Sequence, residues 1–139
     1  VKLAVNNQFD VSDIEVKADN VCYTVDTMSK IKDLYQEDEL FYIIGADSLA
    51  NFMKWREPIR LFEMLHLVVV DREDEDIDTI ADEYRKKYGA KITICHIDKY
   101  DVSSTDIREA IKNNNKVDEF LNQKVKEYIF KHKLYTEDL

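Results

Sequence analysis

Short apolar runs recur along the chain with the lengths expected of β-strands. The segments 40–44 and 67–70 are continuously apolar, which is typical of parallel strands buried on both faces. The segment 92–95 and the alternating stretch 14–16 also fit strands. The pattern therefore predicts a sheet that contains these four segments.

Stretches with helical spacing of apolar residues separate and follow these runs. Such spacing occurs within 25–35 and 77–88, where charged residues fill the opposite face of each predicted helix. After the last predicted strand the pattern is wholly helical, with apolar stripes in 107–111 and 121–129. We therefore expect an α/β fold: a parallel sheet, covering helices and a helical C-terminal end.

Polar residues mark the expected ends of several helices. Thr24 and either Ser103 or Ser104 stand where helix N-caps are expected, and Asp106 completes a capping-box pattern with Ser103. Gly89 follows the second predicted helix and is expected to end it. A polar turn over 113–116 separates the last two helices.

The composition predicts a single globular domain over residues 1–139. Its 45% apolar, 35% charged and 11% aromatic residues are enough for a core. The net charge of −9 and the pI near 4.8 argue against nucleic acid or an anionic membrane as a partner. No apolar run approaches the roughly 20 residues of a membrane span, and 1–10 lacks a secretory pattern, so we expect a cytoplasmic protein. Cys22 and Cys95 share no CxxC spacing, so reduced thiols are expected.

The start of the chain predicts a missing opening segment. Only two glycines and one proline occur, so the chain carries no glycine-rich phosphate loop of its own. The chain also begins at Val1 rather than at a methionine, directly on an apolar pattern. We therefore expect it to be the C-terminal part of a longer domain.

Candidate ligand-binding residues follow the predicted strands, because open parallel sheets bind ligands beyond the carboxyl ends of their strands. Gly45 and Asp47 follow the run 40–44: the glycine lets a ligand approach the backbone, and the carboxylate could accept both hydroxyls of a ribose. A simpler interpretation is that Asp47 or Ser48 caps the following helix. Both interpretations stay open at this point.

Two basic side chains are placed where they could bind phosphate. Arg72 follows the run 67–70, and its guanidinium could fork onto phosphate or pair with the acidic run 71–76. That acidic run is either a metal site or, as we favour, a solvated loop before a helix. Arg108 lies one turn beyond the hydroxyls of 103–105 at a helix N-terminus, a group that suits a triphosphate. A simple capped surface helix would also carry these serine and threonine residues, but it would not need Arg108 on the face that their hydroxyls share.

The tryptophan and the histidines are weaker indications of a functional site. Trp55 is the single tryptophan; it could stack on a heteroaromatic ring, or it could simply pack in the core. The three histidines, His66, His96 and His132, lack metal spacing and favour structural roles. No nucleophile triad can be argued from the order of residues.

These motifs, in this order, resemble the bacterial nicotinate-nucleotide adenylyltransferases of the nucleotidylyltransferase superfamily. The resemblance runs along the whole chain and rests on the segments 23–27, 43–49, 52–55, 68–72, 103–108 and 125–135. The Ser-Ser-Thr-x-Ile-Arg motif at 103–108 is shared across the superfamily and indicates adenylyl transfer. The Gly-Ala-Asp-Ser motif, with Trp55 downstream, narrows the choice of the molecule that accepts the adenylyl group.

The resemblance implies a Rossmann-like fold and transfer of an adenylyl group from ATP to nicotinate mononucleotide, with Mg²⁺ bridging phosphates. On the acceptor side it places the Thr24 backbone on the nicotinate carboxylate, Trp55 on the pyridine ring, and Gly45 and Asp47 at the ribose. It places ATP phosphates on Arg72, Ser103, Ser104, Thr105 and Arg108. Among these, Ser104 and Arg108 act on the departing pyrophosphate and are the implied catalytic residues.

One family signature has no counterpart in the chain. The family carries an H-x-G-H motif on its first strand and helix, whereas no histidine occurs here before His66. The chain as given is therefore expected to be a truncated and inactive form. Alternatives are an adenylyltransferase for nicotinamide mononucleotide or phosphopantetheine, although Trp55 argues against the latter, and a catalytically silent nucleotide-binding module. The oligomeric state stays open, a homo-oligomer included.

Overall fold

The computed structural model describes residues 1–5, 7–71, 76–97, 102–113 and 115–135 of the 139-residue chain. The chain divides into two compact units, one formed by 13–99 and the other by 1–12 with 100–139.

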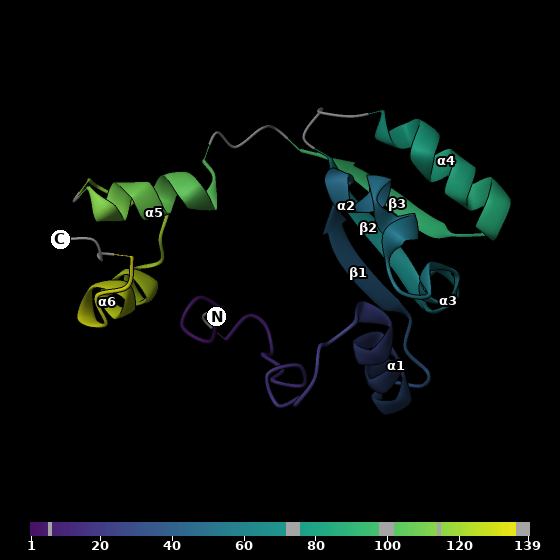
Figure 1. Ribbon diagram of the computed structural model, residues 1–139, viewed down its shortest axis with the longest axis horizontal. Helices are drawn as coiled ribbons and strands as arrows, with labels where there is room; N and C mark the ends of the chain where they lie inside the picture. The colour runs from purple at the N-terminus through teal and green to yellow at the C-terminus, as the bar shows by residue number, and fades with distance from the viewer. Residues whose placement is uncertain (6, 72–75, 98–101, 114, 136–139) are drawn as a thin grey trace. The chain divides into compact units, whose positions relative to one another are not determined.

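The unit 13–99 alternates helices and strands, as the apolar pattern predicts (Figure 1). Its elements are α1 (Thr24–Leu34), β1 (Leu40–Gly45), α2 (Ala46–Ala50), the short 3₁₀ helix η1 (Phe52–Lys54), α3 (Pro58–Met64), β2 (Leu65–Asp71), α4 (Ile77–Tyr88) and β3 (Lys91–His96). The other unit contains α5 (Ser104–Lys112) and α6 (Gln123–Lys131).

The three strands form one parallel sheet in the order β1-β2-β3. Tyr42 pairs with Leu67, and Asp71 pairs with His96, so the carboxyl ends of the strands reach the same edge of the sheet. The loops that follow the strands therefore leave from one side. The predicted α/β fold with a parallel sheet is confirmed.

Helices α2, α3 and α4 cover one face of this sheet (Figure 1). Leu65, Leu67 and Val69 of β2 point into that layer and are almost fully buried. On the opposite face of β1, Phe41 and Ile43 are 58% and 71% exposed. The prediction that 40–44 and 67–70 are buried on both faces is therefore wrong for the described residues, because helices cover the sheet from one side and β1 is an edge strand.

The predicted strand at 14–16 is also wrong, since the segment before α1 folds into turns. The Lys17 N–H donates to the Asp13 carbonyl, and the Thr27 hydroxyl of α1 donates to Glu15 Oε1 at 2.7 Å. An alternation of only three residues is compatible with a turn as well as with a strand. No strand of the described residues pairs with this segment. The side-chain bond to the buried Thr27 instead holds this segment on α1.

Local signals at the helix ends agree with the structure in most cases. Gly89 ends α4 in the left-handed conformation with φ of 66°, and its N–H donates to the Arg85 carbonyl. The predicted C-terminal helices are also present, with a small core of Ile111, Val117 and Ile129 in their unit. None of the described helices is long and apolar enough to cross a membrane.

Candidate functional site

The junction between β1 and α2 brings Gly45 and Asp47 into close contact. Gly45 is the N-cap of α2 with φ of −81°, and α2 has no side-chain cap, so the interpretation of Asp47 or Ser48 as a capping residue is wrong. A Cβ atom on Gly45 would lie 2.6 Å from Asp47 Oδ1. The Asp47 carboxylate thus lies over the backbone of Gly45, at the carboxyl end of β1.

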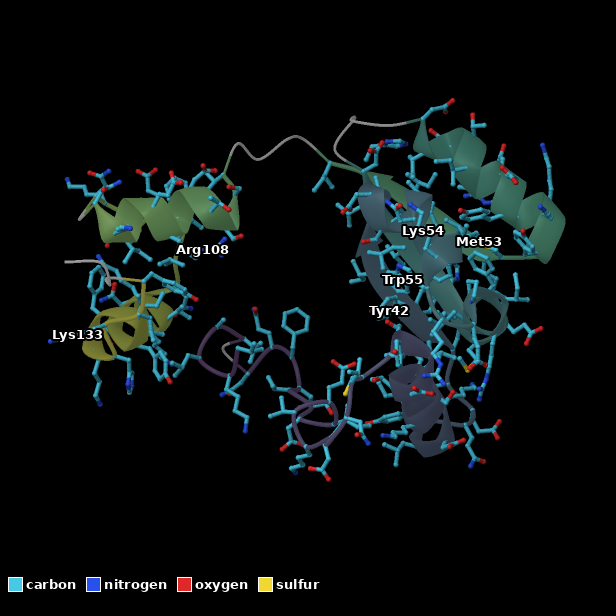
Figure 2. The ribbon with its side chains drawn as sticks, in the orientation of Figure 1. Tyr42, Met53, Lys54, Trp55, Arg108 and Lys133 are labelled. Carbon is cyan, nitrogen blue, oxygen red and sulfur yellow. The ribbon has the colours of Figure 1, made fainter. Side chains whose placement is uncertain are left out.

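The Trp55 indole lies beside β1, just beyond η1 (Figure 2). It stacks on the Phe52 ring with centroids 4.8 Å apart, and it meets the Tyr42 ring edge-on at 6.3 Å. Trp55 is only partly buried, although it packs against the main core. Core packing of Trp55 is therefore present, and part of the indole stays accessible.

The start of α1 lies close to the segment that follows Trp55. The N-cap of α1 is Tyr23, so the prediction of Thr24 as N-cap is wrong: Thr24 is the first residue of the helix, and Tyr23 supplies no side-chain cap. The N–H of a residue at this position has no partner within its own helix. The Arg56 guanidinium lies over the Tyr23 ring, 4.6 Å from its centroid. This contact brings the backbone around Thr24 and the Trp55 segment to one side of the unit.

A second pair of side chains lies at the carboxyl edge of the sheet. Asp71 is 3% exposed, and its Oδ2 accepts a hydrogen bond of 3.0 Å from Nδ1 of His96, its neighbour in register on β3. The sequence analysis did not single out this pair, because the two residues are 25 positions apart. Their shared place directly after two predicted strands was the available signal.

The other two histidines have ring contacts, as expected of structural residues. His66 stacks on Phe41 at 4.7 Å, and its Nε2 lies 2.9 Å from the Thr93 hydroxyl. His132 packs against Tyr128 with ring centroids 4.2 Å apart. Neither histidine joins a metal-binding group among the described residues.

Arg72 lies outside the described residues, as do the residues 73–75 of the acidic run. Among the residues that the structure does describe, no group of three histidine, cysteine or carboxylate side chains could hold a metal ion.

The N-terminus of α5 carries the predicted capping box. The Ser103 hydroxyl accepts from the Asp106 N–H at 3.2 Å, and Asp106 Oδ2 accepts from the Ser103 N–H at 2.7 Å and from its hydroxyl at 2.6 Å. These bonds from Ser103 lower the pKa of the Asp106 carboxyl below its usual value. The Ser103 side chain is therefore already engaged, whereas the Ser104 hydroxyl has no hydrogen-bond partner among the described residues.

Arg108 folds back along α5 toward the same helix N-terminus (Figure 2). Its Nη2 donates to the Thr105 hydroxyl at 3.1 Å, and the residue is exposed. The expectation that Arg108 shares a helix face with a hydroxyl of the motif is confirmed for Thr105. The first turn of α5 thus brings together the Arg108 guanidinium, the hydroxyls of the motif and the free N–H groups of the helix.

The cytidylyltransferase-like family model matches residues 1–110, which include every candidate ligand-binding residue from Thr24 to Arg108. The chain belongs to the cytidylyltransferase-like family. Within this family, it is similar to relatives called probable nicotinate-nucleotide adenylyltransferase. The one from Lachnoclostridium phytofermentans is 35% identical over 97% of this chain and 70% of its own length. The one from Fusobacterium nucleatum is 38% identical over 91% of this chain and 65% of its own. The resemblance found in the sequence is confirmed.

Solved structures support the fold of this cytidylyltransferase-like chain. Plasmodium falciparum nicotinic acid mononucleotide adenylyltransferase, complexed with APC, matches with a TM-score of 0.67 and 20% identity. The match covers 86% of this chain and 61% of that one, and the complex with NaAD gives the same TM-score. The Rossmann-like α/β fold is thereby confirmed. The chain spans 61% of that structure and 65–71% of three curated relatives that it matches.

Proposed function

We propose that the protein containing this chain transfers the adenylyl group of ATP to nicotinate mononucleotide. The 5′-phosphate oxygen of the mononucleotide attacks the α-phosphorus of ATP, and the bond from that phosphorus to the bridging oxygen breaks. The products are deamido-NAD and pyrophosphate. The similarity to nicotinate-nucleotide adenylyltransferases over almost the whole chain carries this proposal.

The unit 13–99 supplies the acceptor side in this proposal. Trp55 stacks on the pyridine ring with its accessible side, and the backbone at Thr24 donates to the nicotinate carboxylate. The Asp47 carboxylate accepts from ribose hydroxyls, and Gly45 lets the sugar approach the chain. The Arg56–Tyr23 contact supports this arrangement, because it holds the Trp55 segment beside the start of α1.

The N-terminus of α5 supplies groups for the phosphates of ATP. Ser104 offers a hydroxyl and a first-turn N–H, and Arg108 offers a guanidinium. These donors stabilise the charge that develops on the departing pyrophosphate, so Ser104 and Arg108 are the proposed catalytic residues. Ser103 and Thr105 contribute mainly through the backbone, since their hydroxyls bond to Asp106 and Arg108. Arg72, which follows β2 in the sequence, is proposed to bind ATP phosphate as well.

Magnesium enters the reaction as part of the substrate, as MgATP. Mg²⁺ keeps several of its waters and commonly binds substrate phosphates with few protein ligands. The reaction then needs no protein nucleophile and depends on positioning and charge stabilisation.

Pyrophosphate release tests the proposed function directly. The whole protein is incubated with MgATP and one acceptor at a time: nicotinate mononucleotide, nicotinamide mononucleotide or phosphopantetheine. We expect deamido-NAD and an equal amount of pyrophosphate with the first acceptor, at a higher kcat/KM than with the other two. Equal or greater turnover of either alternative acceptor would contradict the proposed specificity. ATP binding without any turnover would instead indicate a silent nucleotide-binding module.

A further inference from the structure

Trp55 ends a continuous column of aromatic rings that runs through the core of the unit 13–99. Trp55 stacks on Phe52, Phe52 on Phe62, and Phe62 on Tyr88, with centroid distances of 4.8, 4.8 and 5.8 Å. The successive planes differ by only 29°, 23° and 20°. Each ring of the column, from Tyr88 of α4 to the indole, therefore stacks on the next.

The interior of this column is fixed by burial. Phe52 is 0% exposed and Phe62 is 4% exposed, and Tyr84 of α4 packs against Phe62 at 5.4 Å. Rings so enclosed have no room to tilt, because protein cores are close-packed. The support beneath the indole is therefore rigid.

The indole is held from two directions. Phe52 occupies one face, and the Tyr42 ring meets it at an interplanar angle of 85° (Figure 2). Tyr42 lies on β1 between Leu40 and Ile44, on the helix-covered face of the sheet. The stacked Phe52 ring and the perpendicular Tyr42 ring together restrict reorientation of the indole.

We propose that Tyr42 and Phe52 are positioning residues that hold the Trp55 indole ready to stack on the pyridine ring of the acceptor. This proposal rests on the proposed function, which places that ring on Trp55. A flat ring gains most from stacking when its partner is already oriented, because no side-chain freedom is then lost on binding. Loss of either contact should weaken acceptor binding while ATP binding stays unchanged.

Tyr42 gives the sharper test, because its ring is at the edge of the column rather than in its centre. Tyr42→Leu removes the edge contact, whereas Tyr42→Phe keeps the ring and should restore wild-type behaviour. We expect Tyr42→Leu to raise the KM for nicotinate mononucleotide about three- to tenfold, the range of an aromatic pair. The KM for ATP and the kcat should change less than about twofold.

Tyr88→Leu is the matched control. Tyr88 also stacks in the column, but on Phe62 at the end far from Trp55. This variant should lower the unfolding temperature at least as much as Tyr42→Leu and leave the KM for the mononucleotide unchanged. Equal increases of that KM in both variants would show a general effect of lost stability and would overturn the proposal.

The fluorescence of Trp55, the only tryptophan of this chain, adds a direct readout. In Tyr42→Leu and Phe52→Leu we expect a red-shifted emission maximum, a lower anisotropy and a weaker response to added mononucleotide. If Phe52→Leu fails to fold, the Tyr42→Leu variant alone tests the proposal. Unchanged emission together with an unchanged KM in Tyr42→Leu would overturn the proposal. A wild-type protein that neither turns over nor binds nicotinate mononucleotide would instead overturn the proposed function.

Discussion

The carboxylate of Asp47 lies over the backbone of Gly45, so close that a methyl group on Gly45 would come within 2.6 Å of Asp47 Oδ1. Gly45 itself has an ordinary φ of −81°, so any side chain could adopt its backbone conformation. A side chain at position 45 would therefore have to displace the exposed Asp47 carboxylate, but it would not strain the backbone. The chain contains one other glycine, Gly89, for which the reverse holds: φ is 66° and the space around it is empty.

This contrast predicts opposite effects for two glycine-to-alanine substitutions. Gly45→Ala should displace the Asp47 carboxylate and raise the KM for nicotinate mononucleotide with little change in the free energy of unfolding. Gly89→Ala should cost about 1–2 kcal/mol of unfolding free energy, from the left-handed conformation, with unchanged KM values. Urea unfolding and steady-state kinetics on both variants provide the check. A Gly45→Ala protein with unchanged kinetics would show that the position of Asp47 does not matter for the acceptor.

Trp55→Ala should raise the KM for nicotinate mononucleotide by about fivefold or more, because stacking of a heteroaromatic ring on an aromatic side chain is worth about 1–3 kcal/mol. Trp55→Phe should raise this KM less, since the phenylalanine keeps an aromatic ring above Phe52. Steady-state kinetics with each substrate varied in turn measure both effects. An unchanged KM in Trp55→Ala would mean that the indole serves core packing alone.

Arg108→Ala should weaken ATP use about tenfold or more, because a hydrogen bond to a charged group contributes about 1.5–3 kcal/mol. Arg108→Lys should recover only part of this loss, since a lysine cannot fork onto phosphate oxygens. Lys131→Ala removes an exposed cation from α6 of the same unit and is the control for net charge. If the alanine variants of Arg108 and Lys131 have the same kcat/KM for ATP, Arg108 has no specific role.

The capping box of α5 predicts an acid-sensitive contribution to stability. Hydrogen bonds from Ser103 lower the pKa of the Asp106 carboxyl below its usual 3.8 in the folded protein. The stabilisation is therefore present at neutral pH and is lost as the pH falls below about 3.8 through the folded pKa. Asp106→Asn should be less stable than wild type at pH 7, and this difference should shrink toward pH 3.

Urea unfolding at both pH values measures the difference, and comparison with the variant cancels the titration of the other carboxylates. An NMR titration of the Asp106 carboxyl in Ser103→Ala offers an independent check. Removal of the hydroxyl takes away the largest cause of the shift, so the pKa should move back toward 3.8. A pKa that stays as low as in wild type would show that the Ser103 hydroxyl is not the cause.

Local features of the structure follow from the sequence alone. The capping box joins Ser103 to Asp106, three residues apart, and Gly89 ends α4 directly after its last turn. Such interactions depend on a few neighbouring residues, so their spacing is sufficient to predict them. The alternation of strands and helices, and with it the parallel sheet, follows in the same way from the periodicity of apolar residues.

The relationships that shape the candidate site were decided by the tertiary structure. The spacing of residues does not reveal that Tyr42 meets Trp55 edge-on, or that His96 donates to the buried Asp71, because these pairs come together through packing and strand register. The same holds for β1, whose continuous apolar run predicted burial on both faces. Apolar periodicity specifies which elements form, whereas the strand order and the placement of helices decide which faces of those elements are covered, since burial depends on neighbours that are distant in the chain.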